Sequence, residues 1–158
     1  MNPKILNAKT EKGQSLVELA LVLVFILILL AGVVDLGRMM YEYLTMRDAA
    51  QEGAGYGAAF PNYCAQIINR VAENLPDNTY GVAVIVDGLS FDPLSCEAAW
   101  NADKSLALPT RGCDGNELQV VVTHNFSISM PLLSAFTGPT VPMRVEIRDR
   151  IVRPACGP

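Results

Sequence analysis

An uncharged apolar run near the start of the chain constrains the fold more than any other feature. No charged residue occurs between Leu19 and Val34, and with Leu16 and Val17 the run is interrupted only by Glu18. An α-helix rises ~1.5 Å per residue, so a helix of this length is close to the ~30 Å hydrocarbon thickness of a bilayer. We therefore expect a transmembrane helix that carries one carboxylate, which is costly in lipid unless something nearby needs the charge.

The charges on either side of the run predict its orientation. Lys4, Lys9 and Lys12 precede it against a single Glu11, and the next basic residue is Arg38. The positive-inside rule then places the short N-terminus in the cytoplasm and the rest of the chain outside, as a single-pass membrane protein. The net charge of −4 over 158 residues, with no basic cluster, argues against a nucleic-acid partner.

The four cysteines all follow the apolar run, and an even number of them is typical of disulfides in an oxidising compartment. Three pairings are possible, and the spacing favours Cys96 with Cys113 and Cys64 with Cys156. A zinc site is less favoured because the sequence has no CxxC spacing and His124 is its only histidine.

A cleaved secretory signal would also explain an apolar run. The apolar core of such a signal is usually about 7 to 15 residues long and ends in a small-x-small site, which residues 31–35 match poorly. Apolar residues also continue at helical spacing over residues 36–50. The run therefore predicts the first half of one helix from about Ser15 to about Ala59, roughly 65 Å long, with Pro61 as its stop.

Three short motifs accompany the run. GQSLVE occupies residues 13–18 behind the basic leader, DLGR occupies residues 35–38, and DAAQEGA occupies residues 48–54. Over roughly residues 12–59 the chain resembles the TadE-like family, minor pseudopilin-type proteins of tight-adherence (Tad) pili within the type IV pilin superfamily. The resemblance implies a structural protein of pilus assembly, with no catalytic residues, metal or cofactor.

The resemblance also implies roles for three residues. A prepilin peptidase would cut between Gly13 and Gln14, and Glu18 would be the glutamate that serves assembly with other pilin or pseudopilin subunits. Physically, glycine leaves a backbone that a protease can approach, and a carboxylate in low dielectric can pair with the terminal ammonium of a neighbouring subunit. In the alternative interpretation Glu18 lies at the cytoplasmic interface, near the positive end of its own helix.

The remaining sequence predicts a small mixed head. Residues 64–78 indicate a short helix ended by Pro76, residues 80–86, 118–128 and 141–152 indicate strands, and residues 88–116 indicate a long loop. The predicted fold is α+β and pilin-like: a long N-terminal transmembrane helix extending into a small antiparallel β-sheet head. Its parts are a leader (1–13), the helix (14–60, with its transmembrane half at 16–34) and an extracytoplasmic head (61–158).

Three further features have more than one interpretation. The GAGYG stretch at residues 53–57 follows a helix, so close helix packing is favoured over phosphate binding. His124 has no serine or cysteine nucleophile at an identifiable spacing, so a structural role is favoured over catalysis. Asp35 and Arg38 lie three residues apart on one helical face and pair either with each other or with a neighbouring subunit.

Two functions fit these features. The first is a pseudopilin-like component of a Tad-type pilus, processed after Gly13 and packed through its N-terminal helix. The second is an uncleaved single-span anchor whose disulfide-braced head binds an extracytoplasmic partner. An anchored hydrolase has no catalytic constellation to support it.

Overall fold

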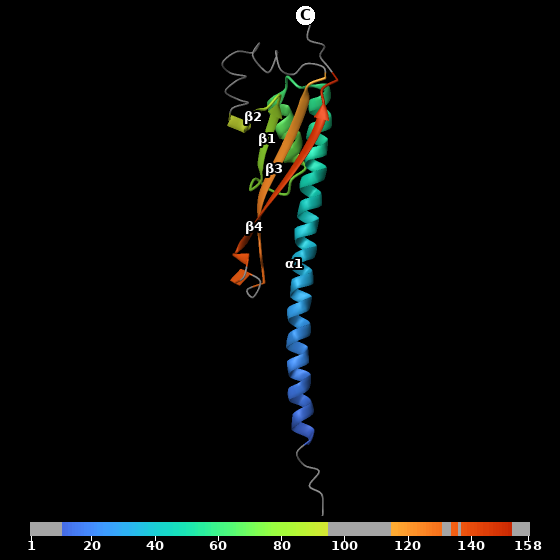
Figure 1. Ribbon diagram of the computed structural model, residues 1–158, viewed down its shortest axis with the longest axis vertical. Coiled ribbons are helices and arrows are strands. Elements are labelled where there is room, and N and C mark those ends of the chain that lie inside the picture. The colour runs from blue at the N-terminus through green and yellow to red at the C-terminus, as the bar shows by residue number, and fades with distance from the viewer. Residues whose placement is uncertain (1–10, 95–114, 131–133, 136, 153–158) are drawn as a thin grey trace, which may run out of the picture.

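The computed structural model describes residues 11–94, 115–130, 134–135 and 137–152. Within these ranges the chain forms one very long helix, one short helix and a four-stranded sheet, which confirms the predicted α+β architecture (Figure 1). The elements are α1 (Glu11–Ala59), α2 (Cys64–Glu73), β1 (Gly81–Val86), β2 (Leu89–Phe91), β3 (Glu117–Ser127) and β4 (Thr140–Arg150).

Helix α1 is a continuous 49-residue helix, about 73 Å long at ~1.5 Å per residue. It begins at Glu11, four residues before the predicted start at Ser15, and it ends at Ala59 just before Pro61 as predicted. Its N-terminal end, where residues 13–27 are all exposed, extends alone, and its C-terminal half lies against the head (Figure 1). One element therefore connects the apolar run rigidly to the head.

The sheet is fully antiparallel, with the strand order β2-β1-β3-β4. Strands β3 and β4 are each 11 residues long and pair from Glu117↔Arg150 to Ser127↔Thr140. In β1 and β3 the buried side chains point mostly to one face. The β3–β4 hairpin runs beside α1 toward the middle of that helix (Figure 1).

Strand β2 corrects the predicted loop over residues 88–116, because Leu89–Phe91 pairs with β1. The two strands are joined by Asp87 and Gly88, which both have positive φ, at 49° and 80°. An Asp-Gly pair between apolar residues is the usual signal of a two-residue hairpin turn, and it was present in the sequence.

The core lies between the C-terminal half of α1, helix α2 and one face of the sheet. Phe126, Met46, Ile67 and Leu118 are among its largest fully buried side chains. The glycine-rich stretch of α1 allows this helix to approach α2 and β3 closely. A Cβ on Gly53 would lie 2.3 Å from Val71 Cγ2 on α2, and a Cβ on Gly57 would lie 2.9 Å from Leu118 Cδ1 on β3. These two glycines pack closely, as predicted from their place after a helical segment.

The cysteine pairings remain predictions. Cys64 is buried at the start of α2 and is not a free thiol. Cys96, Cys113 and Cys156 lie outside the described residues, as does the predicted leader before Glu11.

Candidate functional site

The N-terminal half of α1 carries the residues predicted for processing and assembly. Gly13, Gln14 and Glu18 are all helical and exposed, and a Cβ on Gly13 would meet no atom within 4 Å. Every residue from 13 to 27 is exposed, so no other described part of the chain covers Glu18 or the apolar side chains around it.

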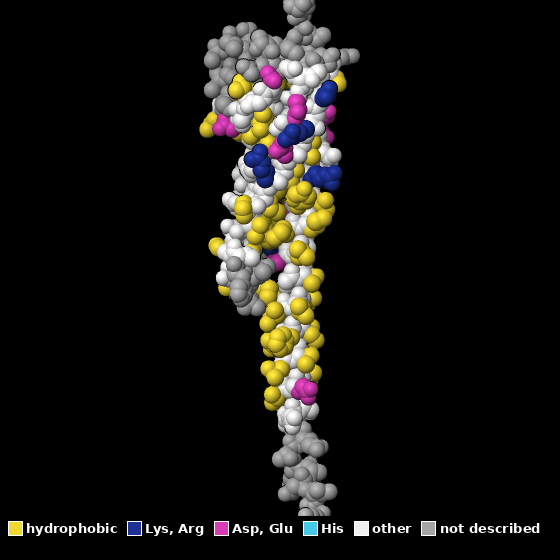
Figure 2. Space-filling model, viewed as in Figure 1, with side chains coloured by type: hydrophobic (Ala, Val, Ile, Leu, Met, Phe, Trp, Pro, Cys, Tyr) yellow, Lys and Arg dark blue, Asp and Glu magenta, His cyan; other side chains and the backbone are white. Residues whose placement is uncertain are grey.

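The visible face of this half is largely apolar (Figure 2), and because no charged residue occurs between Leu19 and Val34, the helix is apolar on all sides there. An 18-residue window of α1 has a mean hydropathy of 3.1, and none of that window is buried. A helix that is apolar all round needs lipid or other helices around it. Length and composition thus make α1 a candidate membrane span, the single one among the described helices.

At the end of the apolar run, Asp35 ties α1 to the β3–β4 hairpin. Asp35 is only 3% exposed. Its Oδ2 accepts a hydrogen bond from the Met130 backbone N–H at 2.8 Å, and its Oδ1 lies 3.7 Å from Arg38 Nη1. The predicted Asp35–Arg38 pair therefore forms within the chain, and it also has a partner that the sequence did not indicate.

Arg38 extends the same contact to the strands. Its Nη1 donates a hydrogen bond to Ser129 Oγ, and its guanidinium lies 5.5 Å from the centre of the Phe126 ring. The ring is fully buried, so the cation covers one edge of the core where the apolar run meets the head. We call these contacts of Asp35 and Arg38 with residues 126–130 the Asp35 junction.

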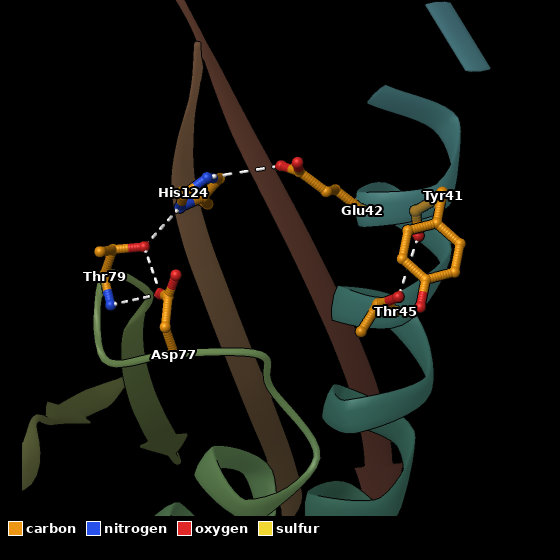
Figure 3. A network of polar contacts seen from close by, with 6 residues as sticks. All are labelled: Tyr41, Glu42, Thr45, Asp77, Thr79 and His124. Carbon is orange, nitrogen blue, oxygen red and sulfur yellow. Dashed lines mark hydrogen bonds and ion pairs between the residues drawn. The ribbon is translucent and has the colours of Figure 1, made fainter. Parts of the chain in front are cut away.

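A second polar contact, one to two turns farther along α1, involves His124 on β3 (Figure 3). His124 Nε2 lies 3.4 Å from Glu42 Oε2 of α1, and its Nδ1 lies 3.3 Å from Thr79 Oγ1. Tyr80 stacks on the imidazole with ring centres 4.1 Å apart. These contacts hold α1, β3 and the segment before β1 together, which supports the structural interpretation of His124.

The electrostatics of this network follow from burial and hydrogen bonding. Thr79 donates both its hydroxyl, at 2.6 Å, and its backbone N–H, at 2.8 Å, to Asp77 Oδ1, and these bonds lower the pKa of the Asp77 carboxyl. Burial raises the pKa of the Tyr80 phenol, and the charge of Glu42 adds to the shift. The Thr79 hydroxyl proton is thus directed at a carboxylate rather than at the imidazole.

The two polar contacts border one open cleft of about 870 Å³ between α1, the segment before β1 and strand β3. Its lining includes Arg38, Glu42, Tyr80 and His124. Within the described ranges, no three His, Cys, Asp or Glu side chains come together in a way that could hold a metal ion.

Family comparison confirms the resemblance seen in the N-terminal part of the sequence. Residues 13–55 match the TadE-like protein family. The matched segment is a little over a quarter of the chain and starts at Gly13, so it includes Glu18, Asp35 and Arg38. No curated protein and no solved structure matches the chain.

The family match and the long apolar helix together indicate a membrane-anchored protein associated with the Tad pilus. The match covers α1 almost to its end and none of α2 or the sheet. The head residues that contact α1 here, His124, Ser129 and Met130, therefore lie outside the family pattern. Arg38 and Ser129 are 91 positions apart in the sequence, and Asp35 and Met130 are 95 apart. No sequence motif links positions so far apart.

Proposed function

We propose that this protein is a minor pseudopilin-like component of a Tad-type pilus, with a structural rather than a catalytic role. In this proposal a prepilin peptidase cuts between Gly13 and Gln14, and α1 then packs against other pilin or pseudopilin subunits. The N-terminus lies in the cytoplasm and the head lies outside the inner membrane until assembly.

The observation that carries the proposal is the environment of Glu18. Glu18 is an exposed carboxylate within the apolar run of α1. No other described residue of the chain pairs with it. A carboxylate at membrane depth is strongly favoured by a nearby cation and strongly disfavoured without one. The terminal ammonium of a neighbouring processed subunit would supply that cation and would cover the apolar side chains beside it.

The continuity of α1 supports the same role. Glu18 and Asp35 lie about 26 Å apart along one unbroken helix, at ~1.5 Å per residue. Because the Asp35 junction ties that helix to the sheet, displacement of the helix in the membrane moves the head with it. The cleavage position lies in the first turn of α1, where helix ends fray most easily.

The test is the substitution Glu18→Ala, with Asp48→Ala as the matched control. Asp48 is an exposed acid on the same helix but outside the apolar run. We expect Glu18→Ala protein to be recovered from membranes at normal levels and to be missing from sheared filaments, whereas Asp48→Ala protein is present in both. Normal incorporation of Glu18→Ala protein into filaments would refute the assembly role.

A second function is supported by the cleft beside His124. An uncleaved single-span anchor would use the head to bind an extracytoplasmic partner, and the cleft of about 870 Å³ offers polar groups from both α1 and the sheet. This function needs neither cleavage after Gly13 nor Glu18. The first residue of the protein recovered from cells therefore separates the two functions.

A further inference from the structure

The connection between β3 and β4 lies beside the apolar run itself. Within residues 13–34 every residue is exposed except Ile28 and Gly32, which are half-buried and lie one turn apart on one face of α1. A Cβ on Gly32 would lie 4.0 Å from Met130 Sδ. We call the described residues of this connection, 128–130, 134–135 and 137–139, the hairpin end.

The length of the apolar run fixes where this contact lies relative to a bilayer. A span needs about 20 residues to cross ~30 Å of hydrocarbon. If the hydrocarbon ended below Ile28, residues 16–27 would remain, which is roughly 18 Å of helix and too short. The span must therefore use the turns that contain Ile28 and Gly32, and Ile28 lies about 10 Å deeper than Asp35. A hairpin end that packs against these turns lies at the same depth.

The distribution of charge along the hairpin agrees with that depth. From Leu118 to Met143 the sequence contains no Asp, Glu, Lys or Arg. The charged residues of the hairpin gather at its far end, where Glu117 pairs with Arg150 and Gln119 with Arg148 in the strand register. Charged side chains also gather on the upper part of the visible face, and apolar ones on the lower part (Figure 2). The hairpin therefore changes from charged to uncharged in the direction of the apolar run.

The backbone of the hairpin end is also suited to a dry environment, where an unpaired N–H or C=O group costs several kcal/mol (about 2–7). Ile128 N–H donates to Pro139 O at 3.1 Å, Ser134 N–H to Met130 O at 3.1 Å, and Gly138 N–H to Ser134 O at 3.0 Å. The Met130 N–H is taken by Asp35. The Asp35 junction thus satisfies a backbone donor at the level where the head meets the membrane surface.

We propose that the hairpin end is a second membrane contact, which inserts into the leaflet on the head side and lies among lipid acyl chains beside α1. This inference rests on the membrane anchoring of α1 in the proposed function. It adds that the head is held at the bilayer by two elements, and that leaving the membrane requires the hairpin end to leave lipid together with the helix.

Depth-dependent fluorescence quenching tests the proposal on the full chain. The single tryptophan, Trp100, is replaced by phenylalanine, and one new tryptophan is introduced at a time. Ala135→Trp provides the hairpin probe, Val24→Trp provides the helix probe in the apolar run, and Ser90→Trp provides the sheet probe on β2, at the far end of the sheet. All three positions are exposed, so the new side chains do not enter the core.

The proteins are placed in phosphatidylcholine nanodiscs at one copy per disc, with and without bromine on the acyl chains. We expect brominated lipid to quench the hairpin probe to an extent similar to the helix probe and to leave the sheet probe unchanged. Acrylamide in water should quench the sheet probe several-fold more than the hairpin probe. Thr137→Trp, at another exposed position, replaces Ala135→Trp if that variant does not fold.

Three outcomes would overturn the proposal. If lipid quenches the helix probe and the hairpin probe behaves like the sheet probe, the hairpin end lies in water while the anchoring of α1 stands. If the helix probe also escapes lipid quenching, the anchoring fails and the proposal fails with it. If the hairpin probe is shielded from both lipid and acrylamide, protein rather than acyl chains covers the hairpin end.

Discussion

The glycines at the C-terminal end of α1 offer a sharp test of how the helix joins the head. Gly53 and Gly55 lie two residues apart in the same helix, but their surroundings differ. A Cβ on Gly53 would lie 2.3 Å from Val71 Cγ2 and 3.6 Å from the Ile67 carbonyl oxygen. A Cβ on Gly55 would meet nothing within 4 Å. The same substitution should therefore have opposite effects at the two positions.

The size of each effect follows from two terms. Alanine in place of glycine inside a helix stabilises it by roughly 0.5–1 kcal/mol, and this term applies at both sites. At Gly53 the added methyl group also overpacks the core, which costs about 1–3 kcal/mol, because Val71 is 0% exposed and its branched side chain has little rotamer freedom. We expect Gly55→Ala to be stabilising and Gly53→Ala to be destabilising by about 1–2 kcal/mol.

Thermal unfolding of the head in detergent, followed by circular dichroism, measures both variants. At roughly 4 °C per kcal/mol for a head of this size, Gly53→Ala should lower Tm by roughly 4–8 °C and Gly55→Ala should raise it by roughly 2–4 °C. Gly57→Ala, whose Cβ would meet the flexible ends of Leu118 and Ile67, should fall between them. Equal shifts of the same sign at positions 53 and 55 would refute the close packing of α1 on α2.

Three other perturbations test the contacts around the site. Asp35→Ala removes the acceptor of the Met130 N–H, whose charge-assisted hydrogen bond is worth about 1.5–3 kcal/mol, so hydrogen exchange of that amide should speed up roughly 10- to 150-fold. Asp35→Asn keeps an acceptor oxygen and should speed exchange far less. Unchanged exchange in Asp35→Ala would count against the bond. Thr79→Ala removes the hydroxyl that lowers the pKa of Asp77, so an NMR titration should find that pKa moved up toward 3.8. Because the folded-state pKa of Asp77 is depressed, the ionised carboxylate stabilises the fold above about pH 3.8, and this stabilisation is lost as the pH falls through the folded-state pKa. Thr79→Ala should therefore reduce the stability that is lost on acidification, and an unchanged Asp77 titration in that variant would contradict the prediction. Phe126→Ala empties a fully buried position and should cost about 3–5 kcal/mol in denaturant unfolding, which a loss below about 1 kcal/mol would contradict.

The elements that the sequence predicted well are those with a strong local signal. The uncharged run and the helical spacing after it predicted α1 to its end at Ala59, and the strands predicted at residues 80–86, 118–128 and 141–152 form as β1, β3 and β4. Strand β2 was missed although Asp87-Gly88 is a hairpin signal, because three residues are too few to show an alternating pattern.

The site was predicted only in the part that lies on one helix. Asp35 and Arg38 are three residues apart, so their pairing follows from helical geometry. The Met130 and Ser129 partners depend on the register of a hairpin more than 90 residues away, which is set by the packing of the whole sheet on α1. Likewise, no local pattern places Glu42 and Thr79 on opposite sides of His124.

The most direct test of the account is the intact mass and first residue of the protein recovered from cell membranes. Processing of a pilin-type precursor predicts a chain that begins at Gln14, with Glu18 as its fifth residue. A chain that still begins at Met1 or Asn2 would contradict the assembly role, and Glu18 would then be a carboxylate at the cytoplasmic surface of a permanent anchor.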